Sequence, residues 1–368
     1  MNLRFRDHAI FLTHLFLHKM EQIESVPLNK IDVHTCRSIL VVATTALGDA
    51  ILCTPLIRSL REQLPNVKIG FWVKEKFASL FQHDPILNVV IPYYGKYRRL
   101  PRTYDRLHTE SFDLALVANA NDPDIIPLIY WSGCRKIIRR PQRDTIYRFM
   151  VANPEMLHAV HSTGHAIERN LEFLSLLKLK EGRPDTYVTV DIVEKRKAEE
   201  LLSSRKRWIG IHPGASVPKK TWPMAHFTKL KEELSKSYPD AGWVVTGSRE
   251  ENEVCEELAR LTGALNLAGK ISLPELAAVQ QQLSLFISGD TGPYHLAMAV
   301  GAPTVTLFAP WDVGSAVSIN GPYFNRQKHK AIEAPDRESG LRSIEPAEVA
   351  GAARSLLNEL KESTCAGS

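Results

Sequence analysis

The sequence predicts two α/β domains, each built on a doubly wound parallel sheet. Short apolar runs typical of buried strands alternate with helical patterns from Ser38 onward, and this alternation starts again at Trp208. A polar segment over residues 181–185 separates the two series and is a plausible hinge. The 368 residues are enough for two domains that each bury a core. Strands and helices alternating at this spacing form parallel sheets that helices cover on both faces.

The composition indicates a globular protein of a reducing compartment. Hydrophobic residues make up 44% and charged residues 24% of the chain, and the net charge is +5. The five cysteines are scattered without CxxC or CxxH spacing, so we expect neither a disulfide framework nor a structural zinc site. No run of about 18 apolar residues is present, so no spanning helix is predicted. We expect a cytoplasmic protein.

Residues 1–35 differ in character from the rest of the chain. Between Phe5 and Met20, large apolar residues are mixed with basic ones, and His14 interrupts the apolar stretch. The small-residue cleavage site of a signal peptide does not follow. Two interpretations stay open: a basic amphipathic helix that lies on a membrane, or a helix packed on the body of the protein.

The expected elements follow in order. In the first series, strands are expected over 39–43, 67–73, 89–91 and 114–117, and helices from the loop 44–49 to about 64, over 77–82 and within 155–181. In the second, strands are expected over 208–212, 243–246, 283–287 and 304–308, and helices over 223–237, 250–261, 272–282 and 294–300. Residues 311–342 look irregular, and 346–362 form a final amphipathic helix. Ligands of such sheets bind at the carboxyl ends of the strands.

The stretch 288–310, SGDTGPYHLAMAVGAPTVTLFAP, has the pattern of a strand, a tight turn, a helix and a strand. Glycine in the turn allows close backbone approach, and the helix start offers unpaired N–H groups with a positive dipole end. Such a turn suits a phosphate or diphosphate. The alternative is an ordinary capped helix, with Asp290 or Thr291 as the N-cap.

Polar loops follow other strands as well. Asp49, beyond Gly48 at the mouth of the first sheet, could accept a proton from a substrate hydroxyl, or could only favour its helix start electrostatically. Ser216 and Lys220 follow the strand 208–212 and would form a second side of a phosphate cradle, although Lys220 could equally be a solvated surface charge. Glu250 and Glu251 follow the strand 243–246, where a carboxylate binds ribose hydroxyls or simply starts a helix.

Four motifs in this order resemble the ADP-heptose:lipopolysaccharide heptosyltransferases, glycosyltransferase family 9 of the GT-B type. They are ATTALGDAILCTPLIRSL, HPGAS with KTWP, VTGSREE, and SGDTGPYHLAMAVGAPTVTLF, and they span residues 39–310. No GxGxxG fingerprint, Walker sequence, HExxH or GxSxG accompanies them. The resemblance implies a GT-B fold, in which two Rossmann-like domains face a central cleft. It also implies inverting transfer of a heptose or related sugar from a nucleotide-sugar donor, ADP-heptose, to a lipopolysaccharide-type acceptor, with no cofactor and no metal.

The resemblance also implies roles for single residues. Asp49 falls on the catalytic base, with Thr44, Thr45 and Gly48 in the same acceptor-side loop. The donor-binding positions of the family fall on Ser216, Lys220, Glu250 or Glu251, Asp290, Thr291, Gly292 and His295. Pro293-Tyr294 departs from the best-studied members inside the DTGxxH motif, which leaves the donor sugar less secure than the diphosphate.

The expected elements and the resemblance together divide the chain into four parts, of which the N-terminal extension has no counterpart in the family. We expect an amphipathic extension over 1–35, an acceptor-binding domain over 36–185, a donor-binding domain over 186–342, and a C-terminal helix over 343–368 that packs back toward the N-terminal domain. Basic clusters over 96–106 and 135–148 suit an anionic glycolipid acceptor and peripheral membrane contact, or are solvated faces. No nucleic-acid motif accompanies them. Two rivals stay open: a nucleotide-sugar epimerase, and a non-catalytic nucleotide-sugar-binding protein.

Overall fold

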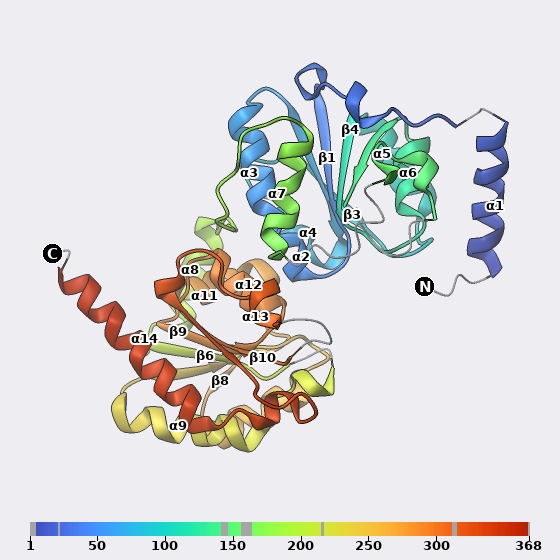
Figure 1. The fold of residues 1–368 in the computed structure, drawn as a ribbon. Coiled ribbons are helices and arrows are strands. Elements are labelled where there is room, and N and C mark those ends of the chain that lie inside the picture. Colours follow the sequence, from blue (N-terminus) through green and yellow to red (C-terminus); the bar gives the residue numbers. More distant parts are fainter. Residues whose placement is uncertain are drawn as a thin grey trace. The chain divides into compact units, whose positions relative to one another are not determined.

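The computed structural model describes residues 5–20, 23–140, 146–155, 164–214, 217–310 and 315–366, and the chain forms two compact units. Unit 1 comprises Met1–Ser162 with Ile167–Pro184, and unit 2 comprises Thr163–Ala166 with Asp185–Ser368 (Figure 1). Both units are parallel-sheet α/β domains, as predicted. The chain passes from unit 1 into unit 2 for the second time after Pro184, which lies in the polar segment 181–185.

Unit 1 is built on a five-stranded parallel sheet with the order β3-β2-β1-β4-β5. The strands are β1 (Ser38–Ala43), β2 (Lys68–Lys74), β3 (Val89–Tyr93), β4 (Leu114–Asn119) and β5 (Lys136–Arg139). All six residues of β1 are buried, because helices cover both faces of the central strand. Its Val41 pairs with Phe71 of β2 and with Leu116 of β4.

Seven helices of the described chain accompany this sheet. They are α1 (Phe5–Lys19), α2 (Leu47–Ile51), α3 (Thr54–Gln63), α4 (Glu75–Phe81), α5 (Leu100–Glu110), α6 (Ile125–Trp131) and α7 (Ala166–Leu176). Figure 1 shows α3, α4 and α7 on one side of the sheet and α5 and α6 on the other. Of the two interpretations of the N-terminal segment, packing on the body is confirmed for one face of α1, since Phe11 and Leu17 pack on the core of unit 1.

Unit 2 is built on a six-stranded parallel sheet with the order β11-β10-β9-β6-β7-β8. The strands are β6 (Trp208–His212), β7 (Gly242–Val245), β8 (Leu265–Asn266), β9 (Leu285–Gly289), β10 (Thr304–Phe308) and β11 (His329–Glu333). The described helices of the unit are α8 (Ile192–Leu201), α9 (Met224–Ser237), α10 (Asn252–Thr262), α11 (Leu273–Gln282), α12 (Gly292–Ala299), α13 (Ala316–Asn320) and α14 (Pro346–Ala366). Ser272 and Glu275 form the expected capping box at the start of α11.

Two expectations about the C-terminal part are wrong. Residues 311–342 are not irregular throughout, because they contain α13 and the edge strand β11, which pairs with β10. The final helix does not bury its apolar face toward the N-terminal domain: Val349, Ala353 and Leu356 of α14 lie in the core of unit 2, with residues of α9 and the sheet. An amphipathic pattern predicts that a helix buries its apolar face, but it does not show which part of the protein covers that face.

Within the described residues, no helix combines the length and the apolar composition needed to cross a membrane.

Candidate functional site

The turn between β9 and α12 is the centre of the site in unit 2. β9 ends at Gly289, and Thr291 is the N-cap of α12 with an extended backbone (φ −139°, ψ 170°). The Thr291 side chain makes no capping hydrogen bond, and its buried Oγ1 has no hydrogen-bond partner among the described residues. The simple alternative of a side-chain-capped helix therefore leaves this hydroxyl unexplained, whereas a ligand at the helix start would satisfy it.

At this turn, Asp290 contacts both a lysine and a histidine side chain. Lys220 Nζ lies 2.8 Å from Asp290 Oδ2, and His295 Nε2 lies 3.6 Å from Oδ1. His295 comes from the first turn of α12, is itself buried, and leaves its Nδ1 without a partner in the described part of the chain. The structure thus brings Lys220, Asp290 and His295 together, as the resemblance implied.

The ionisation of Asp290 follows from these neighbours. Burial by itself would raise the pKa of this carboxyl group, but the adjacent His295 ring and the Lys220 ammonium outweigh burial and hold the pKa below its usual range. Asp290 is therefore an anion at neutral pH. The ion pair with Asp290 orients the Lys220 ammonium at this turn.

Lys220 is held in place by its own segment. The 3₁₀ turn Pro218–Lys220 precedes Trp222, which is buried and donates from Nε1 to the carbonyl of Ile344 at 3.0 Å. Gly340, with φ +56°, packs so closely on the carbonyl of Lys219 that a Cβ there would collide with it. The packing of the KTWP motif therefore holds the Lys220 ammonium at the carboxyl end of the unit 2 sheet.

The carboxyl ends of β6 and β7 add a second part of the site. His212, the last residue of β6, is buried, and its Nδ1 lies 2.9 Å from the carbonyl of Thr246. Burial lowers the pKa of His212, while Glu251 opposes that shift. Beyond His212, the backbone of Gly214 lies against the Glu251 carboxylate, where a Cβ would have no room.

The two glutamates at the start of α10 differ in position. Glu251 Oε2 accepts from the backbone N–H of Ser248 at 2.7 Å, and the same carboxylate covers Gly214. Glu250 is exposed. The structure therefore puts Glu251, rather than Glu250, over the end of β6. Ser216, expected on the diphosphate, lies outside the described residues.

Unit 1 has its own polar loop at the carboxyl end of β1. Asp49 lies in the first turn of α2 and accepts from Thr45 Oγ1 at 2.5 Å and from the backbone N–H of Ala46 at 3.2 Å. Gly48 and Thr44 are buried, and Thr44 Oγ1 has no hydrogen-bond partner among the described residues. Asp49 itself is partly exposed, so its carboxylate can reach a ligand.

Arg140, from the basic cluster 135–148, and Arg169 and Asn170, which the sequence analysis did not single out, belong to the surroundings of this loop. Burial lowers the pKa of Arg169, and the positive charge of Arg140 lowers it further, whereas the charges of Glu172 and Asp49 oppose the shift. Arg140 Nη1 donates to Asn170 Oδ1 at 3.1 Å, and Asn170 Nδ2 donates to the carbonyl of Leu52 at 2.8 Å. Two arginines therefore lie within electrostatic reach of each other near Asp49. A single arginine inside a helical pattern such as 166–176 carries no sequence signal for this role.

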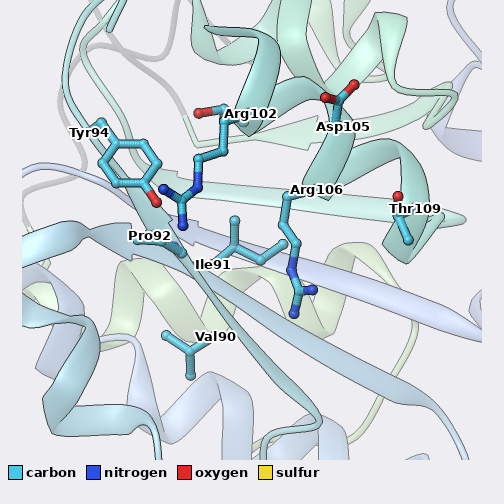
Figure 2. A pocket seen from close by; sticks show the side chains of 9 residues that line it. Val90, Ile91, Pro92, Tyr94, Arg102, Asp105, Arg106 and Thr109 are labelled. Atoms are coloured by element: carbon cyan, nitrogen blue, oxygen red, sulfur yellow. The ribbon is translucent and has the colours of Figure 1, made fainter. Parts of the chain in front are cut away.

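The basic cluster 96–106 lines a cavity of about 630 Å³ between β3 and α5. Figure 2 shows Arg102 beside the ring of Tyr94, and Arg106 one turn further along the same helix. The Arg102 guanidinium lies 5.5 Å from the centre of the Tyr94 ring, and Arg106 pairs with Glu110 at 2.8 Å. One arginine of this groove therefore stacks on an aromatic ring, and the other pairs with a carboxylate.

The Pro293-Tyr294 pair, where the sequence departs from the family pattern, is structural. Tyr294 is fully buried, packs edge-on against Phe308 with ring centres 5.7 Å apart, and donates to the carbonyl of Asn320 at 3.4 Å. Pro293 occupies the first turn of α12, where a missing N–H has no cost. Within the described part of the chain, no group of three or more His, Cys, Asp or Glu side chains could hold a metal ion.

Comparison with known proteins agrees with this geometry. The family model described as glycosyltransferase family 9 (heptosyltransferase) matches residues 134–338. Lipopolysaccharide heptosyltransferase 3 of Escherichia coli strain K12 is 27% identical over 340 residues, which are 85% of this chain and 96% of that protein.

Solved structures share the fold. The family 9 glycosyl transferase from Veillonella parvula DSM 2008 has a TM-score of 0.74 at 20% identity, with 90% of this chain and 99% of that chain covered. The ADP-heptose lipopolysaccharide heptosyltransferase II of E. coli has a TM-score of 0.70 at 21% identity, with 88% and 99% covered.

Proposed function

Because the chain belongs to glycosyltransferase family 9 and is therefore a glycosyltransferase, we propose that it transfers a heptose or a related sugar from an ADP-linked donor to a lipopolysaccharide-type core. The observation that carries this proposal is the turn after β9, where Thr291 Oγ1 and His295 Nδ1 are buried without a hydrogen-bond partner among the described residues, next to the Lys220–Asp290 pair at a helix start. Relatives named for lipopolysaccharide and for ADP-heptose support the choice of donor and acceptor.

In the donor site, unit 2 binds the nucleotide. The N–H groups at the start of α12 and the Lys220 ammonium neutralise the diphosphate, and Thr291 and His295 supply polar contacts to the phosphates and the sugar. Asp290 orients Lys220 and His295. Glu251 accepts from the ribose hydroxyls at the end of β6. The family motifs assign Ser216 and Gly292 to the same donor site.

In unit 1, Asp49 is the general base. Its carboxylate accepts the proton of the acceptor hydroxyl as that oxygen attacks the anomeric carbon of the donor, and the nucleoside diphosphate leaves. Direct attack on the face opposite the leaving group inverts the anomeric centre. Lys220 and the helix start carry the negative charge that develops on the leaving diphosphate, which is the role a metal ion plays in other transferases, so transfer proceeds without one.

The acceptor is an anionic glycolipid. Arg140 and Arg169 repel one another, and Glu172 offsets this repulsion in part, so the two arginines offer positive charge to an acidic group of the acceptor. The groove with Arg102 and Tyr94 offers a further cation and an aromatic ring to a phosphorylated sugar. Because such an acceptor is embedded in a membrane, the enzyme makes peripheral contact with that membrane during transfer.

The test is donor consumption with and without acceptor, in the presence of a chelator. The protein is incubated with ADP-heptose, EDTA and a delipidated core oligosaccharide, and ADP release is measured together with the mass of the oligosaccharide. Acceptor-dependent ADP release with one added sugar per product supports the proposal. Isomerisation of the donor without acceptor would indicate an epimerase, and binding without turnover would indicate a non-catalytic protein.

A further inference from the structure

Helix α1 carries large apolar residues on two opposite faces. The inward face meets unit 1 through Phe11, whose ring lies edge-on to Tyr147 with centres 5.9 Å apart, and through His18, whose ring stacks on Phe149 at 4.7 Å. The outward face carries Leu12, Phe16 and Met20, which are 58%, 62% and 56% exposed. These three residues are spaced four apart and so form one ridge along the helix.

An ion pair to a buried carboxylate helps to fix the orientation of α1. Asp7, the acidic residue of the helix, is 1% exposed, and Lys96 Nζ lies 2.6 Å from its Oδ2. Further along, His14 lies beside Trp131 of α6, with ring centres 6.0 Å apart. Turning the helix to hide its apolar ridge would expose Phe11 and separate the buried Asp7 carboxylate from Lys96.

A helix that is apolar on both faces needs a cover on both. Unit 1 covers one face, and no described segment covers Leu12, Phe16 and Met20. At 15 residues, α1 is shorter than the about 20 that a spanning helix needs, so the matching cover is the interface of a bilayer.

The charges beside the ridge suit an anionic membrane surface. Lys19 lies on the exposed side of α1, and Arg148 is exposed next to Phe149, which the helix contacts. Arg135 stacks on Tyr130 at 3.7 Å, next to Trp131. A two-fold dimer through the same ridge would bring these cations toward their own copies, whereas an anionic leaflet attracts them.

We propose that α1 lies in the plane of the membrane interface, with Leu12, Phe16 and Met20 inserted at the acyl boundary and the neighbouring cations at anionic headgroups. This docking surface rests on the proposed function, because a lipid-linked acceptor brings the enzyme to a bilayer. It holds the acceptor-binding unit at the membrane by an apolar contact that salt does not screen.

The experiment measures binding of the full chain to vesicles of phosphatidylethanolamine and phosphatidylglycerol, without glycolipid, at 0.1 M and 1 M salt. The test variant is Leu12→Ser/Phe16→Ser/Met20→Ser. The matched control is Ile192→Ser/Val193→Ser/Leu201→Ser, which removes three exposed apolar side chains from α8 of unit 2. We expect the test variant to lose about 30-fold or more of the partition constant at 1 M salt, the single variant Phe16→Ser about 5-fold, and the control less than about 2-fold.

Two outcomes would overturn the docking surface. The first is binding of the test variant equal to the unaltered chain at 1 M salt. The second is a dimer of the unaltered chain in sedimentation that the test variant abolishes, which would assign the ridge to a second copy. Circular dichroism and transfer to the delipidated oligosaccharide check folding of the variants. Absence of that transfer in the unaltered chain would overturn the proposed function, whatever the vesicles show.

Discussion

The loop after β1 and the turn after β9 both hold an aspartate at the carboxyl edge of a parallel sheet, yet their surroundings differ. Asp290 is buried between Lys220 and His295, so it is held as an anion. Asp49 is partly exposed and accepts from a threonine hydroxyl and one backbone N–H. A carboxylate that cations hold as an anion orients those cations in a binding site. A carboxylate that only neutral donors contact, and that a ligand can reach, can accept a proton from that ligand.

The two loops also share a feature that marks both as ligand sites. Thr44 Oγ1 in unit 1 and Thr291 Oγ1 in unit 2 are buried without a hydrogen-bond partner among the described residues. Leaving such a group unsatisfied costs about 1–3 kcal/mol, so each hydroxyl is explained best by a ligand that bonds to it.

The largest expected effect concerns Asp49. Asp49→Asn keeps the shape of the side chain but removes the proton acceptor, so turnover at saturating donor and acceptor should fall by about 10²–10⁴. Thr45→Val, which removes only the hydroxyl that orients the carboxylate, should reduce turnover by about 3–10-fold. Steady-state ADP release measures both. Near-normal turnover in Asp49→Asn would move the base to another residue.

Next in size is the loss of donor affinity at the turn after β9. Lys220→Ala removes a charged hydrogen bond, so ADP binding should weaken by about 1.5–3 kcal/mol, which is about 10–150-fold. Gly292→Val should weaken it more, because a branched side chain fills space next to the N–H groups of the helix start. Titration calorimetry with ADP gives both values. Unchanged affinity in the two variants would reject the diphosphate cradle.

A smaller effect separates the two glutamates of α10. Glu251→Gln should weaken ADP binding by about 3–10-fold, because a neutral amide accepts a weaker hydrogen bond from the ribose than a carboxylate does. Affinity for inorganic diphosphate should not change. Glu250→Gln is the matched control, since Glu250 is exposed, and it should bind ADP normally. The reverse pattern would assign the ribose contact to Glu250.

The smallest effect concerns pH and the stability of unit 2. Because the folded pKa of Asp290 lies below its unfolded value of about 3.9, its contribution to stability is present above that value and is lost as the pH falls through the folded pKa. Asp290→Asn should therefore be less stable than the unaltered chain at pH 6–7, and the difference should shrink below about pH 4. Urea unfolding at several pH values measures this. A difference that does not depend on pH would contradict the lowered pKa.

Much of the fold could be predicted because its central strands are continuous apolar runs. The core strands β1 and β6 lie where the sequence analysis expected them. The edge strand β11, HKAIE, was missed because an edge strand packs on one side only and keeps charged residues. α5 was missed because Pro101 and its charged residues hide a helix start, where proline is tolerated.

The site could be predicted only in part. The DTG turn and the KTWP segment each carry a local signal, but 70 residues separate Lys220 from Asp290, and their contact depends on how Trp222 and Gly340 pack. Arg169 has no local signal, because only the fold brings its helix beside the loop of Asp49. The resemblance supplied the roles that spacing alone left open.

The most direct test of this division of labour is the double variant Asp49→Asn/Lys220→Ala, measured for turnover at saturating donor and for ADP affinity. If Asp49 acts on the proton and Lys220 on the donor and its leaving diphosphate, the two fractional losses of turnover should multiply in the double variant, and its ADP affinity should equal that of Lys220→Ala, each within about 2-fold. A double variant whose turnover is no lower than that of Lys220→Ala, or whose ADP affinity is far below it, would show that the two residues serve one shared step.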